Sequence, residues 1–312
     1  MSTLLFTHPS FEKHDTGPGH PESPERIRAI LTQLDTPEFS TLIRRNAPKA
    51  EENTVQLIHT QKHIDSILAS IPKTGYHYVD GDTILSSNSG TAAFCAIGAV
   101  CEAVDSVMKG EALNAFCATR PPGHHAEPER SMGFCIFNNI AVAAEYARIF
   151  YSVQQIAIVD FDVHHGNGTQ AAFYKQPNVL YASTHQSPLY PGTGSLNETG
   201  VGNIINIPLS AGSNGTEFKQ AVKEKLFPAL HHFKPELLLI SAGFDAHRDD
   251  PLASLNLVAE DYAWITRELC NLATRHGHGR IISVLEGGYN LNALAASVAA
   301  HVRELLCCSK NY

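Results

Sequence analysis

The amino-acid sequence predicts an α/β fold, with a mostly parallel sheet covered by helices on both faces. Short apolar runs alternate with longer segments of helical pattern, which is typical of strands joined by helical crossovers. Several of the runs are apolar at nearly every position, as expected for strands that are buried on both faces. No repeat and no linker of disordered composition interrupts this alternation, so residues 1–312 are interpreted as one domain.

Apolar runs of four to six residues mark the strands. They are predicted at residues 4–7, 114–119, 156–159, 179–183, 204–207, 237–241 and 281–285. The run Ile-Ala-Ile-Val at 156–159 is the clearest, because it changes abruptly into polar residues at its end. The loops at residues 74–89 and 184–202 are rich in Gly, Asp, Pro and Ser.

Longer segments with apolar residues at helical spacing, or with many small residues, mark the helices. The first is predicted to begin near Ser23–Pro24, because proline favours the first helical position. The others are predicted at residues 54–70, 90–109, 138–151, 168–174, 216–233, 260–276 and 291–306. No segment is expected to approach the length of a transmembrane helix.

Composition narrows the class of protein. The chain is 43% apolar and 17% charged, an ordinary globular balance, and its net charge of -8 argues against direct binding of nucleic acid. Cys95, Cys117 and Cys135 lie in apolar runs, which predicts core thiols and a reducing compartment. The N-terminus has no basic, apolar leader, so a cytoplasmic protein without membrane attachment is expected, and a homo-oligomer is left open.

The most informative segment is residues 156–170, IAIVDFDVHHGNGTQ, where an apolar run is followed at once by carboxylates and histidines. Asp160, Asp162 and His164 occur at alternate positions, so they share one face if the backbone stays extended beyond the apolar run. Carboxylates and imidazoles at the end of a buried strand are costly unless something compensates them. A divalent metal is the simplest compensation, and a polar loop with satisfied hydrogen bonds is the alternative.

Four strand-end loops carry chemically reactive side chains. They are residues 120–125, 160–165, 242–247 and 286–290. A capped turn, a helix cap or a tight turn explains each loop taken alone. In a parallel sheet, however, all four follow the carboxyl ends of strands and belong to one edge, which is where such sheets bind ligands.

The residue types at this edge predict hydrolysis of an amide or ester. Asp162, His164 and Asp245 offer three ligands and leave coordination positions open, as a catalytic metal requires. Such a metal lowers the pKa of a bound water, the expected nucleophile, and polarises a carbonyl. His124–His125 supply a general base and acid, and Tyr289 follows two glycines as a donor to a developing oxyanion.

The motifs RPPGHH, GFCIFNN, DFDVHHGNGTQ, SAGFDAHRDDP and EGGYN, in this order, closely resemble the histone deacetylase family over nearly the whole chain. The sequence is similar to bacterial members that group with class II deacetylases and acetylpolyamine amidohydrolases. The resemblance implies a three-layer arginase–deacetylase fold around a parallel sheet of about eight strands. It also implies a zinc-dependent amidohydrolase, with Fe²⁺ as the alternative metal. The implied substrate is acetyl-lysine in proteins or peptides, or an acetylpolyamine, and acetate is released.

By this resemblance, the zinc ligands are Asp162, His164 and Asp245, and the catalytic residues are His124, His125, Asp160, Asn167 and Tyr289. Asp160 is expected to orient His124, and His125 is the favoured proton carrier. Many class I members have an aspartate where Asn167 stands, so His125 is expected to be less strongly polarised here. Tyr289 matches the transition-state tyrosine.

The resemblance also implies further subsites. Phe134 and Tyr190 match the aromatic pair of the acyl-lysine channel, to which Gly133 and Gly288 also contribute. Arg26 resembles an arginine that lines an internal acetate exit. A structural K⁺ site is implied at Asp160, Asp162, His164, Ser183 and Thr184.

Two other functions share parts of this pattern. An arginase-like ureohydrolase uses two manganese ions and needs further carboxylates, but those positions are Gly166 and His247 here. A non-catalytic acyl-lysine binder would tolerate loss of Tyr289 or of the tandem histidines, and neither is lost. A tube between Phe134 and Tyr190 suits acyl-lysine and acylpolyamine chains equally, and no role is assigned to loop 74–89 with its Asp80 and Asp82.

Overall fold

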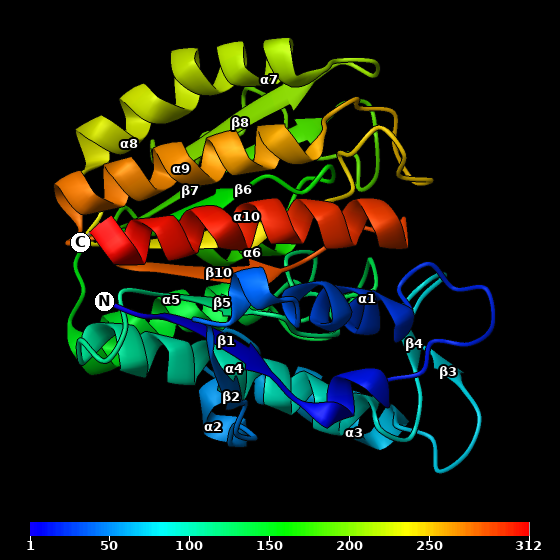
Figure 1. Ribbon diagram of the computed structural model, residues 1–312. Coiled ribbons are helices and arrows are strands. Elements are labelled where there is room, and N and C mark those ends of the chain that lie inside the picture. Colours follow the sequence, from blue (N-terminus) through cyan, green and yellow to red (C-terminus); the bar gives the residue numbers. More distant parts are fainter. Residues whose placement is uncertain (312) are drawn as a thin grey trace.

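The fold is built on one parallel sheet, seen in a computed structural model that describes residues 1–311 (Figure 1). Its eight strands pair in the order β2-β1-β5-β10-β9-β6-β7-β8, and every pairing is parallel. The strands are β1 (Thr3–Thr7), β2 (Ile43–Asn46), β5 (Asn114–Cys117), β6 (Ile156–Asp160), β7 (Val179–Gln186), β8 (Ile204–Leu209), β9 (Leu237–Ala242) and β10 (Ile281–Leu285). A separate antiparallel pair joins β3 (His77–Tyr78) and β4 (Ile84–Leu85).

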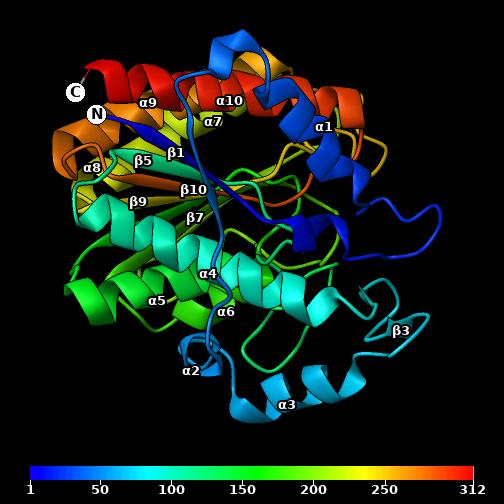
Figure 2. The same cartoon turned by 60° about the horizontal axis from the view of Figure 1, so that its bottom comes forward.

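Helices cover both faces of the sheet, which confirms the predicted α/β fold (Figures 1 and 2). One layer contains α1 (Glu25–Leu34), α7 (Gly215–Ala221), α8 (Phe227–Phe233), α9 (Ala259–His276) and α10 (Leu291–Asn311). The other contains α4 (Ser89–Met108), α5 (Asn139–Tyr151) and α6 (Asn167–Phe173). The short α2 (Glu52–Val55) and α3 (Gln61–Ser70) lie outside α4.

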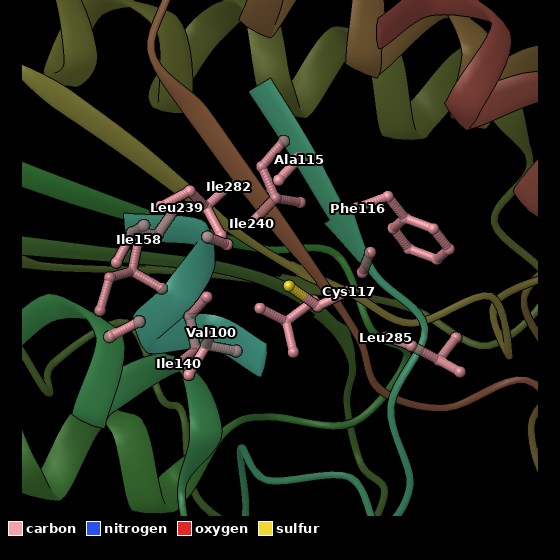
Figure 3. Close-up of a cluster of buried hydrophobic side chains, with 14 of the residues drawn as sticks. Val100, Ala115, Phe116, Cys117, Ile140, Ile158, Leu239, Ile240, Ile282 and Leu285 are labelled. Carbon is pink, nitrogen blue, oxygen red and sulfur yellow. The ribbon is translucent and has the colours of Figure 1, made fainter. Parts of the chain in front are cut away.

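The core lies between the sheet and both helical layers. Ile158, Leu239 and Ile282, from three central strands, are fully or almost fully buried, as is Ile140 of α5 beneath them (Figure 3). Because both faces of these strands are covered, their sequences are continuously apolar and do not alternate. The predicted core thiols Cys95, Cys117 and Cys135 are all buried and free.

Local sequence did not reveal one strand, one break between helices and one π-helical turn within a predicted helix. The edge strand β2 was missed, because its Ile-Arg-Arg-Asn sequence is mostly exposed and lacks an apolar pattern. Residues 54–70 form two helices, since the side chain of Thr60 accepts from the amide of His63 and starts α3 afresh. Residues 216–233 are divided by a π-helical turn at Val222–Leu226, just before Pro228, which has no amide hydrogen to donate.

The expectation that no segment approaches transmembrane length was wrong. Two helices reach that length, over Ser89–Met108 and Leu291–Lys310, with mean hydropathies of 1.5 and 1.2. Much of each is buried in the fold, 78% and 56% of the apolar windows respectively. Core helices pass the same test of length and composition, because the interior of a protein is also apolar.

Candidate active site

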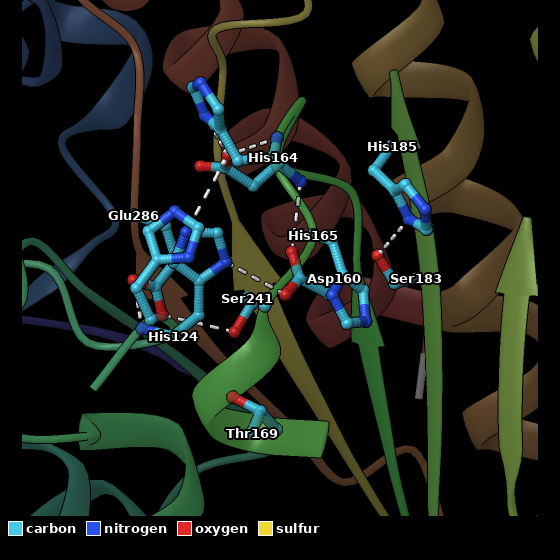
Figure 4. Close-up of polar contacts among 12 residues, drawn as sticks. His124, Asp160, His164, His165, Thr169, Ser183, His185, Ser241 and Glu286 are labelled. Carbon is cyan, nitrogen blue, oxygen red and sulfur yellow. Dashed lines mark hydrogen bonds and ion pairs between the residues drawn. The ribbon is translucent and has the colours of Figure 1, made fainter. Parts of the chain in front are cut away.

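The four loops with reactive side chains follow four neighbouring strands. In the sheet, β5, β10, β9 and β6 lie side by side in this order, although they are far apart in the sequence. Their carboxyl ends therefore deliver the loops to one place at the centre of the sheet edge. Figure 4 shows the resulting cluster of histidines, carboxylates and hydroxyls.

Three of the predicted ligands form a compact, buried group. Candidate ligand atoms of Asp162, His164 and Asp245 lie within 4.8 Å of one another. Nδ1 of His164 is 3.1 Å from an Asp162 oxygen and 3.2 Å from an Asp245 oxygen. A tetrahedral zinc with bonds of about 2.0–2.1 Å separates its ligand atoms by about 3.3 Å, so this donor set fits a divalent cation.

The backbone reaches this arrangement differently from the expected route. Strand β6 ends at Asp160, so the chain is not extended through His164 as the alternate spacing assumed. Instead, Asp162 Oδ1 accepts from the amide of His164 at 2.9 Å, which turns the two side chains toward the same point. The ligands converge through a turn rather than a strand face.

Backbone amides from other loops hold the two ligand carboxylates. Asp162 Oδ2 accepts from the amide of Gly287, and Asp245 Oδ1 accepts from the amide of Val163, both at 2.8 Å. Burial, and then the charge of Asp162, raises the pKa of Asp245 to about 7. Two buried carboxylates thus repel each other in this pocket, and a cation between them would remove that cost.

The tandem histidines have different partners. His124 Nδ1 lies 3.0 Å from Asp160 Oδ2, which also accepts from the hydroxyl of Tyr181. His125 Nδ1 lies 2.8 Å from the amide oxygen of Asn167. The two rings are 4.0 Å apart, so adjacent imidazoles face a carboxylate and a neutral amide respectively.

These partners separate the two titrations. Burial opposes protonation of His124, but the charges of Asp162 and Asp160 outweigh it and raise the pKa of His124 well above its ordinary value. Burial, with the nearby charges of His124 and His164, lowers the pKa of His125 well below its ordinary value. The two tandem imidazoles are therefore shifted in opposite directions, His124 toward its charged form and His125 toward its neutral form.

Glu286 is a fully buried carboxylate at this centre to which sequence reasoning gave no role. Its Oε2 accepts from the amides of Gly123 at 2.7 Å and His124 at 3.1 Å, and its Oε1 accepts from the hydroxyl of Ser241 (Figure 4). Burial raises the pKa of Glu286 to about 7. The residue connects the end of β10 to the histidine loop, and its place in the EGGYN motif was the only sequence signal.

The two residues between Glu286 and Tyr289 must both be glycine, Gly287 because of a close contact and Gly288 because of its backbone angle. A Cβ at Gly287 would lie 2.1 Å from Asp245 Oδ2, and Gly288 has a φ of +120°. Larger residues would collide with a candidate metal ligand or be strained. The two glycines thus let the loop that bears Tyr289 approach the metal-ligand group closely.

The ring of Tyr289 is held on two sides. It packs edge-on against Phe134 at 5.7 Å, and the guanidinium of Arg26 lies 4.9 Å from its centre. Burial, followed by the charge of Asp245, raises the pKa of Tyr289 well above its ordinary value. The hydroxyl therefore keeps its proton at neutral pH and can act as a hydrogen-bond donor.

Comparison with known proteins shows the family of the chain that carries this cluster. The model of the histone deacetylase domain matches residues 20–305. The chain belongs to the histone deacetylase family. It is 37% identical to a probable deacetylase of Archaeoglobus fulgidus, over 93% of this chain and 82% of that protein. It is also 37% identical to a histone deacetylase-like amidohydrolase of Pseudomonas aeruginosa, over 87% and 73% of the two chains.

A solved structure confirms the fold of the family. The HD domain of HDA15 superposes with a TM-score of 0.93 at 35% identity, covering 98% of this chain and 88% of that one. The predicted arginase–deacetylase fold and the predicted resemblance are thereby confirmed. The chain is a histone deacetylase-family hydrolase.

Aromatic rings surround the histidines where the family's acyl channel was predicted. Tyr190, 39% exposed, packs edge-on against His125 at 5.1 Å and lies 6.3 Å from His164. Phe134 has a φ of +67°, and a Cβ at Gly133 would lie 2.5 Å from the ring of His125. This turn holds Phe134 opposite Tyr289, so the structure brings Phe134, Tyr190 and the histidines together.

Loop 74–89, to which no role was assigned, contacts this wall. Thr83 Oγ1 accepts from the amide of Phe134 at 3.1 Å, and His20, whose Nε2 lies 3.1 Å from the carbonyl of Asp82, packs on the Phe134 ring at 4.8 Å. Partial burial and the neighbouring Asp80 raise the pKa of Asp82. Two carboxylates thus lie close together beside the predicted channel.

Arg26, predicted to line an acetate exit, is fully buried beneath the Tyr289 loop. Its guanidinium donates to the carbonyl oxygens of Gly288 and Glu286 and to the carboxylate of Glu22. Glu22 also accepts from Arg120, so one carboxylate lies between two guanidiniums. The exit role stays a prediction, and the visible contact of Arg26 is with the loop backbone.

The residues of the predicted K⁺ site lie where β6 ends beside β7: Asp160 ends β6, Asp162 and His164 follow it, and Ser183 and Thr184 are within β7. Asp160 is the register partner of Ser183, and Thr184 follows it on β7. Oγ of Ser183 lies 2.9 Å from Nδ1 of His185, and all of these side chains are buried (Figure 4). The structure brings the residues together, and the K⁺ itself stays a prediction.

Proposed function

We propose that the protein is a zinc-dependent deacetylase that hydrolyses the acyl amide of acetyl-lysine in peptides or proteins and releases acetate. The observation that carries this proposal is one buried cluster with three metal-ligand side chains, two oppositely perturbed histidines and a protonated tyrosine. Residues 1–312 would act as one catalytic domain. The deacetylase and amidohydrolase relatives support amide hydrolysis as the reaction.

Asp162, His164 and Asp245 would hold Zn²⁺, with Fe²⁺ as the alternative. A divalent cation there supplies a Lewis acid for the acyl carbonyl and lowers the pKa of a bound water. K⁺ is the proposed ion at Asp160 and Ser183, where carboxylate and hydroxyl oxygens are the ligands that hard cations prefer.

The protein's own groups divide the remaining work. His125 is neutral, and Asn167 holds it through Nδ1. Its other ring nitrogen can therefore accept a proton from the attacking water. His124, positively charged beside Asp160, adds a fixed positive charge where negative charge develops. Tyr289 keeps its proton and donates a hydrogen bond to the acyl oxygen as that oxygen gains charge.

Acetylpolyamine amidohydrolysis is the second candidate. The observation that favours it is the pair Asp80 and Asp82, which lie beside Phe134 and near Tyr190, whose pKa they help raise. Carboxylates there would attract the distal ammonium groups of a polyamine. Basic residues that flank an acetyl-lysine in a peptide would be attracted in the same way.

A panel of kcat/KM values over acetyl-lysine peptides and acetylated polyamines tests the proposal. We expect turnover of acetyl-lysine peptides that is lost on chelation and restored by Zn²⁺. Polyamine turnover that exceeds peptide turnover, and falls in Asp80→Asn with Asp82→Asn, would select the second candidate. The absence of acetate release from every substrate by metal-loaded protein would reject both.

A further inference from the structure

The loop that bears Tyr289 is held largely by charged side chains. Arg26 donates to the carbonyls of Glu286 and Gly288, and Asp162 accepts from the amide of Gly287. These contacts fix the first half of the loop. The amide of Tyr289 itself is bound by a residue from a different strand end.

That residue is Asp250, on the β9 loop that also carries Asp245. Asp250 Oδ2 accepts from the amide of Tyr289 at 2.7 Å and, more weakly, from the amide of Asn290 at 3.4 Å. The contact attaches to the backbone of the tyrosine, beyond Gly288 with its φ of +120°. It therefore restrains the point from which the phenol ring extends.

Asp250 is itself immobilised and only 7% exposed. Its Oδ1 accepts from the amide of Leu252 at 3.0 Å, and its own amide donates to the carbonyl of His247 at 2.9 Å. Both carboxylate oxygens are thus used by backbone amides. Because one oxygen binds the β9 loop and the other binds the Tyr289 loop, the Asp250 carboxylate fixes the position of one loop relative to the other.

A purely structural role is the competing explanation. Helix α10 begins at Leu291, and a carboxylate near a helix N-terminus is stabilising. However, the side chain of Asn290 already caps α10 by accepting from the amide of Ala293 at 3.0 Å. The shorter contact of Asp250 is with Tyr289, one residue before that cap.

We infer that Asp250 is a positioning residue for Tyr289, which sets the place of the phenol hydroxyl by binding the tyrosine's backbone amide. The inference rests on the proposed role of Tyr289 as donor to the acyl oxygen. Reaction geometry is sensitive to displacements of about 1 Å, which can cost on the order of 10²-fold in rate. Misplacing the hydroxyl cannot cost more than removing it, so the loss in Tyr289→Phe sets the upper limit.

The first test measures the loop without relying on activity. In Asp250→Asn, the side chain keeps its size but has only one acceptor oxygen for amides on two sides. Amide hydrogen exchange followed by mass spectrometry should show faster exchange at Tyr289 and Asn290, and unchanged exchange in β9 and β10. The matched control is Asp249→Asn, whose side chain is 58% exposed. Unchanged exchange at Tyr289 in the Asp250 variant would overturn the inference.

The second test is a double-mutant cycle with Tyr289→Phe. We expect Asp250→Asn to lower kcat by about 10–100-fold with little change in KM, and to lower it less than about twofold in the Tyr289→Phe background. Equal losses of kcat in both backgrounds would show a structural role and overturn the inference. Zinc content measured in all four proteins must remain one per chain, because loss of metal would also point to a structural role.

A second variant, Asp250→Glu, provides the test if Asp250→Asn does not fold. Asp250→Glu keeps both acceptor oxygens but displaces them by one methylene, and it should give the same non-additivity with a smaller loss. Failure of the proposed function is distinguishable from failure of this inference. If metal-loaded wild-type protein releases no acetate, the proposed function fails, while a low wild-type exchange rate at Tyr289 that rises in the variant would still show the restraint.

Discussion

His124 and His125 are adjacent and of the same residue type, yet their surroundings differ. His124 faces the carboxylate of Asp160, and Glu286 accepts from its backbone amide. Nδ1 of His125 contacts the amide oxygen of Asn167, whose own amide group donates to Glu127 at 2.8 Å. The imidazole of His124 thus contacts a carboxylate directly, whereas the neutral side chain of Asn167 lies between the imidazole of His125 and the carboxylate of Glu127.

This difference fits the proposed roles of the dipeptide, with His124 as the charged group and His125 as the base. Two imidazoles 4.0 Å apart repel when both are protonated, so a charge held on one favours neutrality in the other. The charges of Asp162 and Asp160 favour protonation of His124 rather than of His125. Residue type alone does not assign these roles, because the partner of each Nδ1 does.

Removing the candidate metal ligand His164 should have the largest effect, because neither His124 nor His125 can then contribute to catalysis. His164→Ala should lose the divalent ion, and turnover should fall to the uncatalysed background, because both histidines act on a carbonyl that is no longer polarised. Elemental analysis together with acetate release measures both effects, with Asp249→Asn as the control. Turnover that persists without metal would reject the site, and two catalytic metals per chain would reject a single-ion mechanism.

Tyr289→Phe should give the next largest loss. The variant keeps the ring that packs on Phe134 but removes the donor. We expect kcat to fall by about 10²–10³-fold, roughly 2.7–4 kcal/mol, with little change in KM. Metal content and the melting temperature serve as controls. A near-normal kcat would leave stabilisation of the acyl oxygen to the charged His124 and the metal.

Asp160→Asn tests the charged half of the comparison. Losing the carboxylate removes one of the charges that favour protonated His124, together with the contact at its Nδ1, and we expect kcat/KM to fall by about 10²-fold, the lower end of general acid–base effects. Steady-state kinetics with matched circular dichroism spectra measures this. A loss as small as that of an exposed control would mean that the charge of His124 is not used.

Asn167→Asp tests the neutral half and should have the smallest effect at the optimum pH. A carboxylate beside His125 favours its protonated form and should raise its pKa by about 1–3 units. Because the neutral imidazole is the active base, activity should be lost at a higher pH than in the wild type as the solution is acidified. The acidic limb of the kcat/KM profile should thus move to higher pH, with activity largely recovered above the new pKa.

The control for that shift is Glu127→Gln, which removes the more distant charge. It should move the acidic limb much less, and to lower pH. An unshifted limb in Asn167→Asp would assign the observed titration to another group and reassign the base.

The amino-acid sequence by itself predicted a set of candidate site residues and the strands that they follow. Its apolar runs predicted seven of the strands, and the positions of Asp162, His164 and Asp245 after two of those strands predicted the candidate ligand group that the fold assembles. These signals are readable because a buried strand is apolar whatever it pairs with, and because buried charges at its end stand out from that pattern.

Only the tertiary structure decided how those strand ends meet. Strand order places β5, β10, β9 and β6 together, and no local pattern records it, just as none records the exposed edge strand β2. The contacts of Glu286 and Asp250 could not be predicted from the sequence either, since each side chain accepts from backbone amides of distant loops. Every residue except proline has such an amide, so the sequence does not show which carboxylate will bind it, and long-range packing makes that choice.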